Sequence, residues 1–134
     1  ASLRGRIIAM YAFQMHCQGC VKLALPQAQA VRRHFPRERV AVIGLHTVFE
    51  NHAAMTEEAL AGFLRDQQIT FPIAIDQPDD ARPTGVPSTM HAYGMQGTPT
   101  VTLIDREGRL RLQRLGHVPD LELGVALGAL LNES

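Results

Sequence analysis

The chain has 134 residues and a mass of 14.7 kDa, and its 13 Lys and Arg residues balance 13 Asp and Glu residues. This length suits one domain with a sizeable core, and a hydrophobic content of 46% is too high for a disordered chain. Zero net charge argues against nucleic acid or an acidic membrane surface as a partner, because both require excess Lys and Arg. No apolar run approaches the roughly 18 residues that a membrane-spanning helix needs. Two cysteines are too few for a small secreted protein framed by disulfides.

Five segments have the pattern of β-strands. The first four are nearly continuous apolar runs, which is typical of strands buried on both faces of a parallel sheet. The fifth follows a turn sequence, Asp105-Arg106-Glu107-Gly108, so the last two strands are predicted to form an antiparallel hairpin. The predicted strands are Ile7–Phe13, Val40–Leu45, Phe71–Ile75, Thr100–Ile104 and Leu110–Leu115.

Helices are predicted between these strands. The first follows Cys17, and Pro26 is expected to kink it or to mark an early break. The second has Thr56 as its N-cap, a short one covers Thr89–Tyr93, and the last begins near Pro119. The order β-α-β-α-β-α-β-β-α favours a mainly parallel, twisted sheet covered by helices, with an antiparallel edge.

We expect a single domain over residues 1–134, with residues 77–88 as a Pro-rich loop. The N-terminus has no secretory-signal pattern, and the first core strand begins almost at once. Residues upstream of Ala1 are therefore expected to have been removed.

Both cysteines lie in Cys17-Gln18-Gly19-Cys20, where a buried strand ends and a helix begins. The N–H groups and partial positive charge of a helix N-terminus favour thiolate over thiol, so Cys17 is the expected nucleophile. Cys20, one turn along, can close a disulfide or resolve a mixed one, and His16 is a potential positive neighbour of Cys17. Zinc binding and two inert buried thiols are the alternatives, but no second Cys-x-x-Cys or His-x-x-x-His completes a metal site.

A second motif, Gly97-Thr98-Pro99-Thr100, directly precedes a strand. A proline that opens a strand donates no hydrogen bond to the sheet, and X-Pro is the common route to a cis peptide bond. Together with the Cys-x-x-Cys sequence, this motif predicts a cis peptide bond before Pro99.

Taken in order, these motifs resemble the thioredoxin fold, and specifically the redoxin (AhpC/TSA-like) proteins of the TlpA type, which are thiol–disulfide oxidoreductases. The resemblance spans most of the chain. It implies a three-layer α/β fold with a central mixed sheet, helices on both faces and an inserted helix and strand within residues 50–76. The segments that carry it are Leu3–Arg6, Phe13, Cys17–Cys20, Val42–Thr47, Phe71–Asp76, Ala92–Gly94, Gly97–Thr100 and Leu103–Gly108.

The resemblance also implies roles. Cys17 and Cys20 would be the catalytic pair, with Cys17 attacking and Cys20 resolving. Pro99 would pack against the disulfide, and backbone groups of Thr98 would bind an extended segment of the partner. His16 would support the site at the position where the family usually has Trp.

Two departures concern proton transfer. Thioredoxins place a buried Asp six residues before the first cysteine, where this chain has Tyr11, and many TlpA-type members have a Glu just after the motif, where Val21-Lys22-Leu23 supplies no acid. Water or His16 are the candidates for the missing base.

Two other functions share the fold. A peroxiredoxin requires Pro and Thr at the positions of Met10 and Gln14, so peroxidase activity is the weaker enzyme hypothesis. Copper carriers use a Cys pair with three intervening residues and a distant His, whereas this pair has two. The candidate third ligands are His46, His52, His91 and His117.

The expected partner is a protein thiol or disulfide, with no dissociable cofactor and no metal. A surface around Met15, His16 and Met95 is a hypothetical contact for an apolar partner segment. A lone redox pair without structural disulfides favours the cytoplasm over the periplasm.

Overall fold

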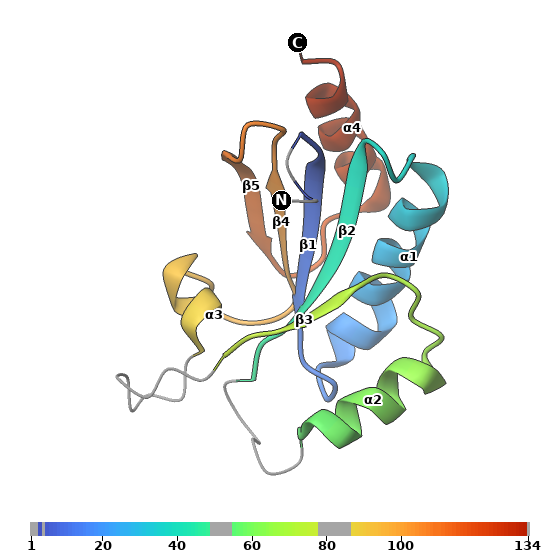
Figure 1. Ribbon diagram of the computed structural model, residues 1–134, viewed down its shortest axis with the longest axis vertical. Coiled ribbons are helices and arrows are strands. Elements are labelled where there is room, and N and C mark those ends of the chain that lie inside the picture. The colour runs from blue at the N-terminus through green and yellow to red at the C-terminus, as the bar shows by residue number, and fades with distance from the viewer. Residues whose placement is uncertain (1–2, 4, 49–54, 78–86, 134) are drawn as a thin grey trace.

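The computed structural model describes residues 3, 5–48, 55–77 and 87–133. Figure 1 shows a central sheet with helices packed around it. Most of the predicted loop at 77–88 lies outside the described residues, as do His52 and the start of the predicted insertion at residue 50. Among the described residues, none of the helices combines the length and the apolar character that a bilayer crossing requires.

The sheet has five strands in the order β3-β2-β1-β4-β5. The pairs β1/β2 and β2/β3 are parallel, and the pairs β1/β4 and β4/β5 are antiparallel. The sheet is therefore mixed, as expected, and its antiparallel part extends to the central strand β1. The strands are β1 (Ile7–Phe13), β2 (Val40–His46), β3 (Ile73–Ile75), β4 (Thr100–Ile104) and β5 (Leu110–Leu115).

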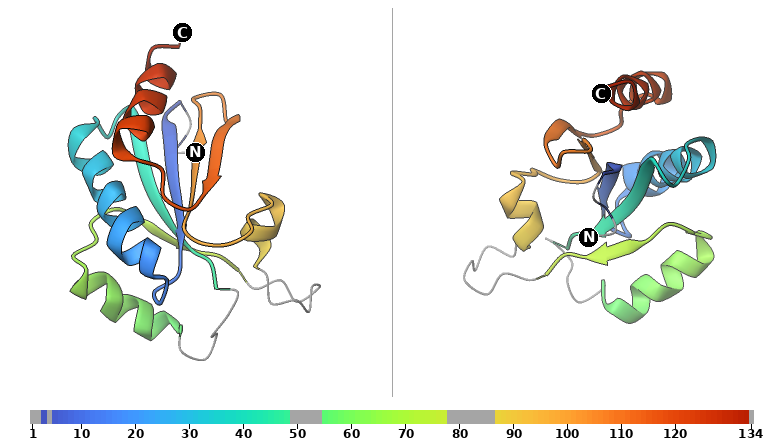
Figure 2. Two further views of the ribbon diagram at one scale, coloured as in Figure 1. Left: turned by 180° about the vertical axis from the view of Figure 1, so that it is seen from behind. Right: turned by 45° about the horizontal axis from the view of Figure 1, so that its top comes forward.

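Helices lie on both faces of the sheet. α1 and α4 cover one face, α3 covers the other, and α2 lies beside the β3 edge (Figures 1 and 2). This arrangement confirms the predicted three-layer α/β fold with an inserted helix and strand. The helices are a short π-helix, η1 (Cys20–Ala24), followed by α1 (Leu25–His34), α2 (Glu57–Asp66), α3 (Ser88–Ala92) and α4 (Asp120–Leu131).

Proline sets two boundaries within these elements. Pro26 was predicted to kink the first helix or to mark an early break, but the helical backbone continues through Ala24 and Leu25, and only its hydrogen bonding changes from π to α. The N–H of Leu25 donates to the carbonyl of Cys20, and Pro26 lies in the first turn of α1. The third strand was predicted from Phe71 but begins at Ile73. Pro72 has no N–H for a sheet hydrogen bond, although its carbonyl still accepts from the N–H of Gly44 at 2.9 Å.

Alternation along β1 divides the core between the two faces of the sheet. Tyr11 and Phe13 face α1 and α4, and they belong to the larger apolar cluster, which includes Cys20 and Leu127. Met10 faces α3 in a smaller cluster. The carboxyl ends of β1 and β2 meet at one edge of the sheet, with Phe13 in register with His46. The cysteine motif begins at this edge.

Candidate active site

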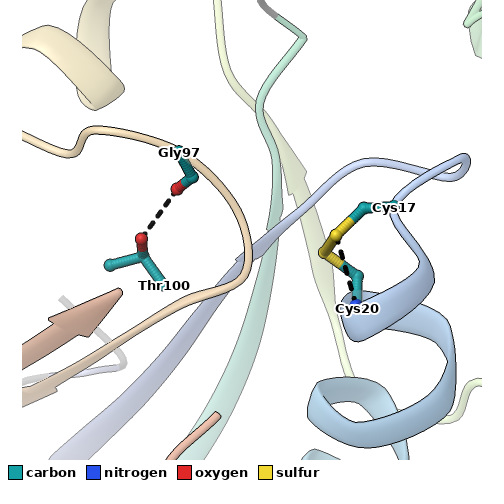
Figure 3. The surroundings of a disulfide bond; sticks show 4 residues. All are labelled: Cys17, Cys20, Gly97 and Thr100. Carbon is teal, nitrogen blue, oxygen red and sulfur yellow. Dashed lines mark hydrogen bonds between the residues drawn. A yellow bond between two sulfur atoms is a disulfide. The ribbon is translucent and has the colours of Figure 1, made fainter. Parts of the chain in front are cut away.

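Cys17 and Cys20 form a disulfide where the chain leaves β1 and enters η1, with 5.2 Å between their Cα atoms (Figure 3). Cys17 is half-buried, whereas Cys20 has no exposed surface. The backbone N–H of Cys20 donates to Sγ of Cys17 at 3.2 Å. A partner molecule can therefore reach the sulfur of Cys17 but not that of Cys20.

The hydrogen bond to Cys17 has a chemical consequence after reduction. The N–H of Cys20 belongs to the first turn of the helical segment, where backbone donors lack carbonyl partners within the helix. A donor aimed at Sγ stabilises negative charge there, and the helix dipole adds to the effect. The geometry thus favours a thiolate at the accessible cysteine.

Pro99 lies across from the cysteine motif. The Thr98–Pro99 peptide bond is cis, as predicted, and Pro99 is buried. A Cβ atom placed on Gly19 would lie 3.4 Å from Cδ of Pro99, so the proline ring contacts the middle of the motif. The structure therefore brings the two predicted motifs together, although they are far apart in the sequence.

Hydrogen bonds hold the loop that carries Pro99. The carbonyl of Pro99 accepts from the N–H of Gly116 at 2.8 Å, and Oγ1 of Thr100 donates to the carbonyl of Gly97 at 2.7 Å (Figure 3). Thr98 is half-buried, and its backbone N–H and C=O have no hydrogen-bond partner within the described part of the chain. These two groups remain available to a bound segment.

The residues next to the pair differ in exposure. His16 is exposed beside Cys17, so the structure keeps it at the rim of the site. The sequence suggested an apolar contact surface around Met15, His16 and Met95. That suggestion is wrong for the two methionines, because Met15 is only 8% exposed and Met95 only 7% exposed. Met15 packs into the core on the α1 face and Met95 into the core on the α3 face, because burial of these long apolar side chains stabilises the fold.

Tyr11 occupies the position of the buried acid in thioredoxins and makes a different set of bonds. Its hydroxyl donates to Oε1 of Gln27 at 2.9 Å. Nε2 of Gln27 donates to the carbonyl of Val118 at 2.6 Å and to Oδ1 of Asp120 at 2.8 Å. Burial, together with the nearby negative charge of Asp120, raises the pKa of Tyr11, so the phenol stays neutral. The network joins β1 to α1 and α4.

His46 is a buried residue at the same edge of the sheet as the pair. It is 3% exposed, and its ring lies 5.2 Å from that of Phe13, centroid to centroid. Burial lowers the pKa of His46 to about 4. The sequence singled out His46 only as a potential metal ligand. Its position at the end of an apolar run does not tell whether its side chain is buried or exposed. Gly19 and Gln27 were missed for a similar reason, since their partners come from distant segments.

The structure also bears on the two alternative functions. Among the described residues, no group of three or more His, Cys, Asp and Glu side chains could hold a metal ion. At the positions where a peroxiredoxin has Pro and Thr, Met10 and Gln14 are both buried, and Met10 packs on the opposite face of the sheet from Cys20. Neither alternative has an observation in its favour.

Comparison with known proteins gives matches among solved structures. No protein-family model matches the chain, and neither does any curated protein. The thioredoxin-like superfamily protein SPOA0173 is 50% identical, with a TM-score of 0.94 over 98% of this chain and 84% of that one. A thiol-disulfide isomerase from Corynebacterium glutamicum is 46% identical, with a TM-score of 0.96 over 99% of this chain and 85% of that one.

A more distant neighbour shares the fold alone. StoA from Bacillus subtilis is 21% identical, with a TM-score of 0.69 over 90% of this chain and 81% of that one. The identity to the first two proteins, over nearly the whole chain, decides the family. The chain belongs to the thioredoxin-like superfamily and is a thiol–disulfide oxidoreductase, with Cys17 and Cys20 as its Cys-x-x-Cys pair.

Proposed function

We propose that the chain exchanges two electrons with a protein partner through Cys17 and Cys20. The unequal exposure of the two cysteines supports the order in which they react. The thiolate of Cys17 attacks a disulfide of the partner, which forms a mixed disulfide and releases one partner thiolate. Cys20 then attacks Sγ of Cys17, releases the second partner thiolate and closes the Cys17–Cys20 disulfide. The reverse sequence oxidises a partner dithiol.

The observation that carries this proposal is the contrast between the half-buried Cys17 and the fully buried Cys20. Only Cys17 can meet a sulfur held on another folded chain. Cys20 acts afterwards by attacking Cys17 within the same molecule, so this step does not require a second encounter with the partner.

Thr98 and Pro99 complete the proposed binding site. An extended partner segment would pair with the backbone N–H and C=O of Thr98, in the way that a strand adds to a sheet edge. Pro99, packed on Gly19, would hold that segment beside the pair. Such backbone recognition tolerates many side chains, which favours a protein substrate over a small metabolite.

The test is to trap the partner. In a cell extract, a Cys20→Ser chain should accumulate a mixed disulfide through Cys17, because the resolving thiol is missing. Cys17→Ser is the matched control and should trap nothing. Full disulfide reductase activity in Cys17→Ser, or equal trapping by both variants, would overturn the proposal.

A further inference from the structure

A cavity of about 430 Å³ lies beside the amino-terminal half of β2. β3 pairs only with residues 44–46 of β2, so residues 40–43 have a neighbouring strand on one side alone (Figure 1). The apolar side chains of residues 40–43, together with Ile73 on β3, form much of the cavity wall. The cysteine motif follows the carboxyl end of β1, which is parallel to β2, so the cavity lies at the opposite end of the sheet from the redox pair.

The free edge of β2 also offers a backbone donor on this side. The N–H of Gly44 donates to the carbonyl of Pro72 at 2.9 Å. Alternate residues of a strand direct their hydrogen-bonding groups to the same side, so the N–H of Val42 points the same way as that of Gly44. β3 does not extend to Val42, which lines the cavity. An edge group of this kind is ready to pair with another molecule.

Three arginines line the cavity from separate segments of the chain. Arg6 precedes β1, Arg32 lies in the last turn of α1, and Arg37 lies between α1 and β2. Nη1 of Arg6 donates to the carbonyl of Arg37 at 2.9 Å, which ties the two segments together. None of the described residues that line the cavity is acidic. The cavity therefore combines concentrated positive charge with apolar walls.

The guanidinium groups of Arg32 and Arg37 form no ion pair with a carboxylate in the described part of the chain. Nε of Arg32 is buried and has no hydrogen-bond partner among these residues. Burial, and after it the positive charge of Arg37, lower the pKa of Arg32, so the two charges lie near each other. An unpaired buried donor and two adjacent like charges both cost free energy, and an anion held between the arginines would relieve both costs.

The helix dipole does not account for this cluster. Basic residues are favoured in the last turn of a helix, and α1 has Arg32, Arg33 and His34 there. Arg6 and Arg37, however, line the cavity from outside the helix. The arginines of β5 and of the turn before it differ in that each pairs with a carboxylate. They are Arg109, Arg111 and Arg114.

We propose that this cavity binds a small organic anion, in which an oxyanion group on an apolar body pairs with Arg32 and Arg37. The planar donors of a guanidinium group match the oxygens of a carboxylate or a phosphate. The side chains of β2 and β3 surround the apolar body, and the cavity volume lies in the range of small-molecule sites. The site is separate from Cys17 and Cys20, so the inference goes beyond the proposed function.

A fluorescent organic anion, anilinonaphthalene sulfonate, tests the cavity in the oxidised chain. Its fluorescence should increase on binding and saturate at one dye molecule per chain. Phenylnaphthylamine has the same aromatic body without the sulfonate group, and it should bind at least about tenfold more weakly, because it cannot form charge-assisted hydrogen bonds with the arginines.

Two variants locate the dye. Arg32→Gln and Arg37→Gln should each raise the Kd of the sulfonate dye by about fivefold to tenfold, because each removes a charged donor. Arg33→Gln is the matched control, since Arg33 is an exposed neighbour on α1 that does not line the cavity, and its Kd should stay within about twofold of the wild type. Urea denaturation of each variant checks that the fold is retained.

Competition identifies the oxyanion. Displacement of the dye by octanoate would support a carboxylate ligand, and displacement by octyl phosphate would support a phosphate ligand. Displacement by neither would overturn the proposal. Equal dye affinity in the wild type and in a folded Arg32→Gln, Arg37→Gln double variant would also overturn it. Equal affinity of the two dyes, or displacement by inorganic phosphate as effective as that by octyl phosphate, would show that the site does not select an organic anion.

Discussion

The ring of Pro99 lies against Gly19, in the middle of the cysteine motif, so that a Cβ atom on Gly19 would be 3.4 Å from Cδ and 3.8 Å from Cγ of the proline. This contact links the start of the helical segment to the loop before β4. It brings the loop that carries Thr98 against the segment between the two cysteines. The spacing leaves room for a methyl group but not for a branched side chain.

Gly19→Val should therefore lower kcat/KM for a protein disulfide by roughly tenfold, because the loop must move away from the pair and misplaced groups lose reactivity steeply. Gly19 has a helical backbone, with φ of −63°, so Gly19→Ala is the matched control and should stay within about twofold of the wild type. Insulin reduction measures both variants. Equal activity of the Val and Ala variants would show that the Pro99 contact does not position the partner.

Gly44 faces a second restriction, inside the core. A Cβ atom there would press on Ile73 and would lie 3.2 Å from Cε1 of Phe71 and 3.3 Å from Cε1 of Phe13. Gly44→Ala should lower the free energy of unfolding by about 1–3 kcal/mol, measured by urea denaturation, since those rings must shift.

Gly128→Ala is the control for that measurement. Gly128 lies in α4, and a Cβ atom there would meet nothing within 4 Å. This change should stabilise the chain by about 0.5–1 kcal/mol, because alanine favours helix over glycine. Loss of stability in Gly128→Ala comparable to that in Gly44→Ala would point to a general intolerance of substitution rather than to crowding around Gly44.

Most strand positions could be predicted from the sequence because apolar runs and turn residues are local signals. β1, β4 and β5 have the predicted bounds, and β2 extends one residue further, to His46. β3 is shorter because Pro72, within its apolar run, cannot donate a sheet hydrogen bond.

The candidate site was predictable only where its residues form contiguous motifs. The Cys-x-x-Cys pair and the Thr-Pro sequence each carry a local signal, and the fold places them face to face. The burial of His46 depends on its register with Phe13, and the bonds of Gln27 depend on where α4 begins. These pairings join residues that are far apart in the sequence. They depend on tertiary packing, which cannot be predicted from the spacing of residues along the chain.

The hydrogen bond between Tyr11 and Gln27 makes its own prediction. Tyr11→Phe removes the donor to Oε1 of Gln27 and leaves a buried acceptor unpaired, which should cost about 1–3 kcal/mol of unfolding free energy. A double-mutant cycle with Gln27→Leu should show that the two changes are not additive, because each removes the same bond. Additive losses in urea denaturation would mean that the bond contributes little to stability.

Acid should destabilise the fold through His46. The pKa of this imidazole is about 4 in the folded chain, below its ordinary value of 6.5, so the unfolded chain binds more protons between these two pH values. The contribution of His46 to stability is then complete well above pH 6.5 and is lost as the pH decreases towards 4, by about 3 kcal/mol in total. Urea denaturation of the oxidised chain across this window measures the loss, and His46→Phe should flatten it because phenylalanine has no proton to bind. Asp105, whose pKa is lowered chiefly by the backbone N–H of Arg109, contributes its own acid sensitivity only at lower pH. An unchanged slope in His46→Phe would assign the loss of stability to other groups.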